Sequence, residues 1–129
     1  MVAYSFKEMF APKILAGTKR QTIRAIGKRR HARPGEELQL YTGMRTRQCK
    51  LIARATCEDI QPIKIVFSSF GVSEKILING KEIYGEPALD EFAKKDGFPR
   101  WLHMRAFWKE QHGDINEFEG VLITWNPLA

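Results

Sequence analysis

The most constraining feature of the chain is the dipeptide Asn79-Gly80, which lies between two segments of alternating apolar and polar residues. Asn-Gly is the pair most typical of a two-residue hairpin turn, because both central positions of that turn need a positive φ angle. The surrounding sequence, ILINGKEIY, therefore predicts an antiparallel β-hairpin within Glu74–Tyr84. Antiparallel β-structure must be part of the fold.

Helical spacing of apolar residues predicts three helices. They are expected at Ser5–Ala16, Pro87–Lys95 and Pro99–His112. Ser5 is the candidate N-cap of the first helix, with Glu8 at the capping-box spacing. Pro12 either breaks this helix near Ala11 or lies in the first turn of a helix that begins there, and Gly17 ends it.

Alternating or continuous apolar runs predict five strands besides the hairpin. They are expected at Arg20–Ile26, Glu37–Thr42, Gln48–Cys57, Ile60–Phe67 and Phe118–Trp125. The order along the chain is one helix, several strands, two helices and a last strand. This order is typical of an α+β fold, here a small mixed or antiparallel β-barrel with flanking helices, and 129 residues suit one domain covering 1–129.

Positive charge is concentrated in one part of the sequence. Between Lys13 and Arg54 there are 12 Lys and Arg residues against the two acids Glu36 and Glu37, a net charge of +10. From Ala55 onward, 8 Lys and Arg face 12 acids, a net charge of −4. A basic half on an acidic body favours a polyanionic partner or an anionic ligand, although a solvated basic surface would give the same count.

The sequence gives little indication of a membrane protein, a secreted disulfide-bonded protein or a metal-binding protein. No apolar run approaches the roughly 18–20 residues that span a bilayer, and the N-terminal sequence lacks a signal pattern, so we expect a cytoplasmic protein without a membrane partner. On one continuous strand, Cys49 and Cys57 would lie about 26 Å apart, so both are expected to be reduced core thiols. The three histidines show no ligand spacing, and neither a metal nor a cofactor is expected.

The stretch Ile14–Arg24, ILAGTKRQTIR, is the strongest candidate for a ligand site. Lys19 and Thr22 are a possible base and nucleophile, because neighbouring cations lower the pKa of a lysine. Arg20 and Arg24 could clamp a phosphate or carboxylate. On spacing alone, a surface lysine and an ordinary strand threonine are the favoured explanation of the first pair.

Further candidates lie outside this stretch. The basic loop GKRRHARP would contact phosphates through Lys28, Arg29, Arg30 and Arg33. Tyr41 could stack on a base or pack half-buried in its strand. Asp96, in the sequence DGF, is either an orienting carboxylate or a turn residue ahead of Gly97.

Together these motifs resemble the ASCH domain, a family related in fold to PUA domains. The resemblance rests on ILAGTKRQTIR, PGEELQLYTG, the two spaced cysteines, DGF followed by W, M and FW, and FEGVLITW. It extends from about Phe6 to Trp125. The resemblance implies a PUA-like β-barrel with flanking helices, and a cleft lined by the turn between the first helix and the next strand.

The resemblance also implies functions. ASCH domains are generally taken to bind RNA or nucleotide ligands. One bacterial branch is similar to an amidohydrolase that deacetylates acetylcytidine, with a Thr nucleophile, a Lys base and a Glu. Thr22 and Lys19 match the first two positions, and Asp96, or alternatively Glu91, takes the third. Another branch resembles a single-strand ribonuclease, for which Tyr41, Lys50 and the basic loop are candidates.

Two functional hypotheses follow. The first in rank is a domain that binds RNA, a nucleotide or a modified nucleoside at a basic cleft around Lys19–Arg24, with hydrolysis as an added possibility. The alternative is an enzyme, an amidohydrolase acting on acetylcytidine or a ribonuclease. A free nucleoside carries no phosphate, so the enzyme hypothesis leaves the excess positive charge unexplained. The oligomeric state is not predicted.

Overall fold

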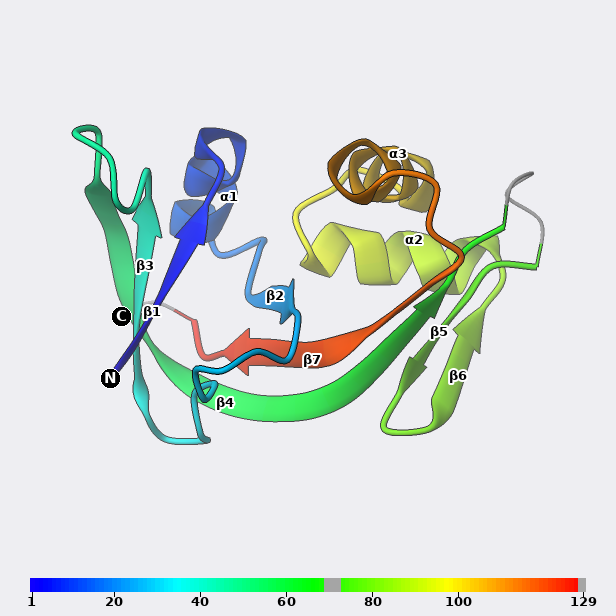
Figure 1. The fold of residues 1–129 in the computed structure, drawn as a ribbon, viewed down its shortest axis with the longest axis horizontal. Coiled ribbons are helices and arrows are strands. Elements are labelled where there is room, and N and C mark those ends of the chain that lie inside the picture. Colours follow the sequence, from blue (N-terminus) through cyan, green and yellow to red (C-terminus); the bar gives the residue numbers. More distant parts are fainter. Residues whose placement is uncertain (69–72, 128–129) are drawn as a thin grey trace.

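The computed structural model describes residues 1–68 and 73–127, which form an α+β fold with one mixed sheet and helices on its concave side (Figure 1). The strands are β1 (Val2–Phe6), β2 (Gln21–Arg24), β3 (Glu37–Thr42), β4 (Lys50–Val66), β5 (Lys75–Ile78), β6 (Lys81–Tyr84) and β7 (Glu117–Trp125). The helices are a 3₁₀ turn η1 (Glu8–Phe10), α1 (Ala11–Ala16), α2 (Glu86–Lys95) and α3 (Trp101–His112).

The long strand β4 organises the sheet. Its first half pairs with β3 and its second half with β7 and β5, all antiparallel, while β7 pairs in turn with β2. Two separate strands, Gln48–Cys57 and Ile60–Phe67, were predicted here, which is wrong. Instead, a β-bulge between Cys57 and Asp59 lies inside one continuous strand.

The N-terminal segment differs most from the prediction. Residues Val2–Phe6 form β1, parallel to β3, and the helix begins only at Ala11. The expected N-cap Ser5 therefore lies in a strand, where Tyr4 and Phe6 are buried. The spacing of Phe6, Met9 and Phe10 fits a helix as well as it fits a strand followed by a turn, so periodicity could not separate the two. Pro12 lies in the first turn of α1, as one alternative predicted.

Other predicted elements are confirmed. The hairpin joins β5 to β6 through Asn79 and Gly80, whose φ angles of 52° and 82° are those of the expected turn. Helices α2 and α3 and strands β3 and β7 lie within two residues of their predicted bounds. Cys57 is buried, but Cys49 is exposed, so the core assignment was wrong for Cys49.

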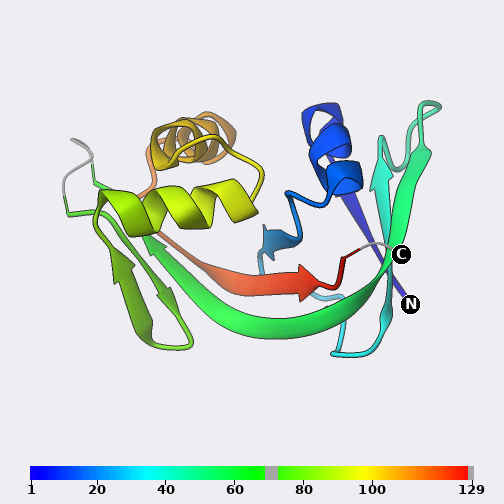
Figure 2. The same cartoon turned by 180° about the vertical axis from the view of Figure 1, so that it is seen from behind.

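The sheet is strongly bent, and α1 and the α2–α3 pair lie above its hollow side (Figures 1 and 2). The strand pairings among the described residues leave it open and do not close it into a barrel. The core lies between sheet and helices; its fully buried side chains include Ile14, Leu38, Leu40, Ile65, Ile76, Met104, Ile123 and Trp125. In the described part of the chain, no helix has the length and apolar character needed to cross a membrane.

Candidate functional site

A cavity of about 350 Å³ lies between β1, β2 and α3. We call it the Lys19 cavity. Four polar residues of the predicted site reach it: Lys19, Thr22, Arg24 and Asp96. Its walls also include six Phe and Trp residues: Phe6, Phe10, Phe98, Phe107, Trp108 and Phe118. The structure therefore gathers residues from two distant parts of the sequence around one open pocket.

The turn after α1 positions the polar residues from β2. Helix α1 ends at Gly17, and the backbone N–H groups of Thr18 and Lys19 both donate to the carbonyl of Lys13. This cap fixes the turn, and the chain then enters β2, which pairs with β7. Thr22 and Arg24 lie on one face of β2, since alternate residues of a strand share a face, and the Arg24 Nε donates to the Thr22 hydroxyl at 3.1 Å.

Lys19 is paired with Asp96 inside the protein. The Lys19 Nζ donates to the backbone carbonyl of Asp96 at 2.6 Å and lies 3.7 Å from the carboxylate oxygen Oδ1. Gln21 donates to the same carboxylate oxygen at 3.2 Å. Burial lowers the pKa of Lys19, and the Asp96 carboxylate opposes that shift. Burial likewise raises the pKa of Asp96, opposed by Lys19.

Aromatic rings surround the two cavity cations. The Lys19 Nζ lies 4.7 Å from the centre of the Phe10 ring, and the Arg24 guanidinium lies 5.0 Å from that of Phe6 and 5.2 Å from that of Tyr4. Cations over aromatic faces gain electrostatic stabilisation that offsets part of their lost hydration. Charged groups are thereby kept in an otherwise apolar cavity.

The four basic residues of the loop at 27–34 have different environments. Arg30 forms a two-point ion pair with Glu36, at 2.8 and 2.6 Å, and its charge is neutralised there. Lys28, Arg29 and Arg33 have no carboxylate partner among the described residues and are exposed. The run predicted as one phosphate-binding group thus divides into a structural arginine and three unpaired cations.

Several predicted site residues lie away from the Lys19 cavity. Arg20 and Glu91 line another hollow, between α2 and β7. Tyr41 is half-buried in β3, and its hydroxyl donates to Gln39. Lys50 is exposed at the start of β4, where it pairs with Thr42, the next residue after Tyr41, so Lys50 and Tyr41 point to opposite faces of the sheet.

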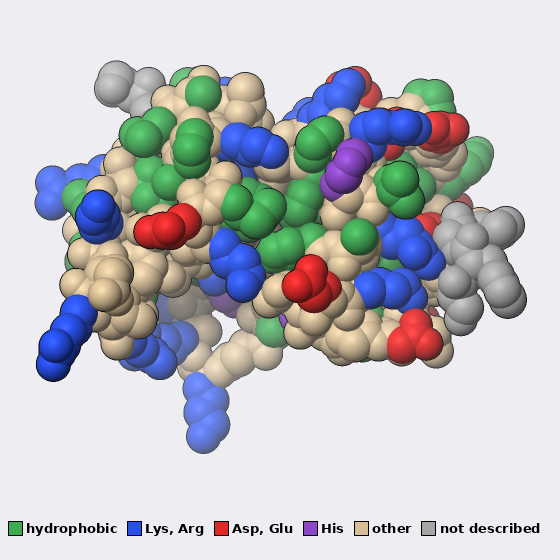
Figure 3. Space-filling model, turned by 90° about the horizontal axis from the view of Figure 1, so that it is seen from above, with side chains coloured by type: hydrophobic (Ala, Val, Ile, Leu, Met, Phe, Trp, Pro, Cys, Tyr) green, Lys and Arg blue, Asp and Glu red, His purple; other side chains and the backbone are tan. Residues whose placement is uncertain are grey.

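Sequence reasoning missed the aromatic walls and the role of Gln21. Phe6 and Phe10 fell within the helix expected at Ser5–Ala16. Trp108 is buried in the core and Phe107 packs against it, and both also line the Lys19 cavity. Seen from above the helices, hydrophobic side chains gather in the middle of the surface, with Lys and Arg side chains beside them (Figure 3). The clustering of aromatic residues after the sequence DGF is the pattern that could have indicated these aromatic walls.

The described residues contain no group of three or more His, Cys, Asp or Glu side chains arranged to hold a metal ion. Comparisons with protein-family models, with curated proteins and with solved structures found no match to this chain. The site is therefore interpreted from its own geometry and chemistry.

Proposed function

We propose that the Lys19 cavity binds the base of a nucleoside or of an RNA nucleotide. The observation that carries this proposal is the convergence of Lys19, Thr22, Arg24 and Asp96 on one cavity with aromatic walls. Flat heterocycles bind between aromatic side chains, and polar groups at the edge of the base select among bases. Hydroxyl, ammonium and carboxylate groups supply both donors and acceptors for such an edge.

The size of the cavity supports a ligand of this class. At about 350 Å³ it is near the lower end of the roughly 300–1,000 Å³ typical of small-molecule sites. One base or one nucleoside suits this volume, whereas a base-paired duplex does not. The recognised nucleotide would therefore be single-stranded or free.

The proposal includes the fold that the resemblance to ASCH domains implies. The strong curvature of the sheet around β4 and the position of Lys19 on the turn between α1 and β2 support an ASCH domain, and a PUA-like barrel is part of this proposal. A nucleic-acid ligand at that turn is what this resemblance implies.

An amidohydrolase is the second candidate, favoured by one specific observation. Lys19 is buried, and burial lowers its pKa, which increases the fraction of neutral amine available as a base. In this reaction Lys19 accepts the Thr22 proton, the Thr22 oxygen attacks the amide carbonyl, and the leaving amine takes the proton back. The acyl ester on Thr22 is then hydrolysed by water. The Arg24 N–H that already points at the Thr22 oxygen would stabilise its negative charge.

Nucleoside binding tests the first proposal. We would titrate the four ribonucleosides and acetylcytidine into the wild-type protein and into Trp108→Leu and Phe10→Leu, with calorimetric detection. At least one ligand should bind, and both substitutions should weaken it by about tenfold, as expected for the loss of aromatic stacking. Leu102→Ala, on the exposed side of α3, is the matched control. Absence of binding by every nucleoside and every RNA would contradict the proposal.

Turnover of acetylcytidine tests the second candidate. Release of cytidine would be followed chromatographically for the wild type, Thr22→Ala, Thr22→Ser and the control Thr124→Ala. If the protein is this enzyme, Thr22→Ala should lose turnover of acetylcytidine, Thr22→Ser should keep part of it, and the control should keep all of it. A wild type without turnover excludes that substrate but leaves base binding intact.

A further inference from the structure

We propose that the phosphate next to the bound base occupies a second hollow, on the other side of Arg24. The preferred ligand is then a nucleotide or a single-stranded RNA segment and not a free nucleoside. This hollow has a volume of about 510 Å³ and is lined by residues 1–3 and by Tyr4, Arg24, Ala25, Arg29, Arg30 and His31. We call it the phosphate hollow. The inference rests on the proposed function of the Lys19 cavity.

The two spaces share a wall. Arg24 and Ala25, at the end of β2, line both the Lys19 cavity and the phosphate hollow. The base and the phosphate of a nucleotide are separated by one ribose, so a ligand that occupies both spaces must pass this shared wall. Arg24 therefore lies between the two groups of the ligand.

Arg24 has charge and hydrogen-bonding capacity left for an anion. Its Nε donates to Thr22 and its Nη2 to the carbonyl of Ser5, at 3.1 and 2.6 Å. No described carboxylate lies within ion-pair distance, and its Nη1 has no acceptor among the described residues. Burial lowers the pKa of Arg24, opposed by Tyr4 and the Asp96 carboxylate, so holding this cation inside the protein has a desolvation cost. A phosphate oxygen would remove that cost and accept the unused donors.

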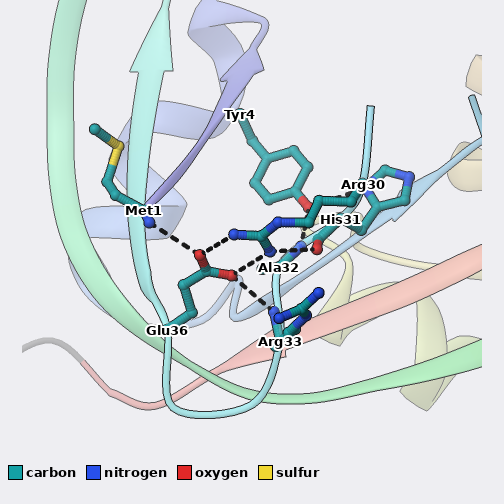
Figure 4. A network of polar contacts seen from close by, with 7 residues as sticks. All are labelled: Met1, Tyr4, Arg30, His31, Ala32, Arg33 and Glu36. Atoms are coloured by element: carbon teal, nitrogen blue, oxygen red, sulfur yellow. Dashed lines mark hydrogen bonds and ion pairs between the residues drawn. The ribbon is translucent and has the colours of Figure 1, made fainter. Parts of the chain in front are cut away.

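The basic loop is held as a wall of this hollow. Glu36 accepts from the Arg30 guanidinium, from the backbone N–H of Arg33 and from the N-terminal amine (Figure 4). The Tyr4 hydroxyl contacts His31 Nδ1 at 3.0 Å, and His31 Nε2 lies 2.8 Å from the carbonyl of Ala25. Since a carbonyl only accepts, Nε2 carries the proton in that contact.

Arg29 and Arg30 are adjacent in sequence but differ in what they can bind. In Figure 4 the Arg30 guanidinium points at Glu36, which satisfies its charge within the protein. Arg29 lines the same hollow and has no carboxylate partner among the described residues. Arg29 and Arg24 are thus the two unpaired cations of the hollow, and Arg30 holds the loop that carries Arg29.

This assignment accounts for an observation that base binding leaves unexplained. A nucleoside is uncharged, yet the part of the chain that builds the site carries a net charge of +10 between Lys13 and Arg54. A phosphate next to the base gives that charge a partner. In a longer strand, the exposed Lys28 and Arg33 would contact neighbouring phosphates.

The experiment compares ligands that differ only in phosphate. The affinities of the four ribonucleosides, their 5′- and 3′-monophosphates and a mixed-sequence RNA hexamer would be measured for the wild type, Arg29→Gln, Arg24→Met and Arg54→Gln. Arg54 is an exposed β4 residue outside both spaces, so its variant controls for the loss of one positive charge. Unfolding curves for each variant show whether it is folded.

A monophosphate should bind about tenfold or more tightly than its nucleoside, as expected for charge-assisted hydrogen bonds. Arg29→Gln should remove most of that advantage, and Arg54→Gln should keep it. Raising the salt concentration should weaken binding of the monophosphate and leave binding of the nucleoside nearly unaffected. Arg24→Met should also reduce the advantage, and Arg29→Gln remains decisive if Arg24→Met does not fold.

The two proposals fail in different ways. Equal affinity for nucleoside and monophosphate, unchanged by Arg29→Gln, overturns the phosphate hollow and leaves base binding standing. A second result is hexamer binding that depends on Arg29 and is unaffected by Trp108→Leu and Phe10→Leu. That result would contradict the proposal that the base next to this phosphate occupies the Lys19 cavity. Hexamer binding that falls equally in Arg29→Gln and Arg54→Gln shows only general attraction to basic surface and also overturns the proposal.

Discussion

The Lys19 Nζ lies 2.6 Å from the backbone carbonyl of Asp96 and 3.7 Å from its carboxylate, although the two residues are 77 positions apart. This contact joins the turn after α1 to the connection between α2 and α3. Both side chains are almost fully buried, at 3% and 8% exposure. Each charge therefore depends on the other for compensation.

Replacing one partner should destabilise the fold. Lys19→Met should lower the free energy of unfolding by about 3–5 kcal/mol, because it leaves Asp96 buried without its cation. Adding Asp96→Asn should recover about 2 kcal/mol, since the uncompensated charge is then gone. Urea unfolding of both single variants and the double variant measures this coupling. Lys95→Met, an exposed position on α2, is the control, and strictly additive losses would contradict the coupling.

Glu36 should make the protein sensitive to acid. The ion pair with Arg30 and the other donors hold its pKa well below the usual value of 4.5. A carboxylate with a depressed folded pKa stabilises the protein above its unfolded pKa, and this contribution is lost as the pH falls below about 4.5. Stability measured between pH 6 and pH 2 should therefore fall less steeply in Glu36→Gln than in the wild type. Parallel profiles would show that the Glu36 network contributes nothing.

Gly120 should be intolerant of a side chain. A Cβ at this position in β7 would lie 2.3 Å from the carbonyl oxygen of Arg24, closer than atoms can approach. Gly120→Ala must displace the end of β2, so we expect a loss of about 1–3 kcal/mol and weaker nucleotide binding through Arg24. Gly27→Ala, where a Cβ meets open space, is the control. Calorimetric unfolding and monophosphate titration measure the two effects, and unchanged values in Gly120→Ala would be the contrary result.

Glu74 should matter far more than exposed acids. Its carboxylate accepts from Arg105 at 2.7 Å and from the Trp101 indole at 3.0 Å, with 1% of the side chain exposed. Glu74→Leu should cost about 3–5 kcal/mol because Arg105 loses its partner inside the protein. Glu82→Gln breaks an exposed ion pair with Lys75 and should cost less than about 1 kcal/mol. The midpoints of denaturant unfolding, with unchanged dependence of the unfolding free energy on denaturant, measure both losses of stability. Equal losses in Glu74→Leu and Glu82→Gln would contradict this prediction.

Local chemistry accounts for the parts of the fold that were predictable. Asn79-Gly80 defines a hairpin because few dipeptides adopt two consecutive positive φ angles. Gly17 and Gly97 follow the ends of α1 and α2, and alternation in Glu37–Thr42 gives β3 with Leu38 and Leu40 buried. These features depend on a few neighbouring residues.

The misassigned elements have a different cause. Val2–Phe6 is a strand because it pairs with β3, more than thirty residues further along the chain, and its own apolar spacing is ambiguous. Strand β4 remains continuous through its bulge because β3, β7 and β5 pair with successive parts of it. Neither set of partners can be identified from a local pattern.

The sequence by itself determined most of the secondary structure. It also determined that Lys19, Thr22 and Arg24 follow the end of a helix, at the entry to a strand. Only the tertiary structure decided which cations share a site. The packing of Phe10 against Phe98 and Phe107 joins the N-terminal segment to the α2–α3 pair, and Asp96 meets Lys19 there. Arg20 instead lines another hollow, and Arg30 is paired with Glu36. Local periodicity fixes the direction of a side chain within its element, whereas the residues it meets depend on the packing of distant elements.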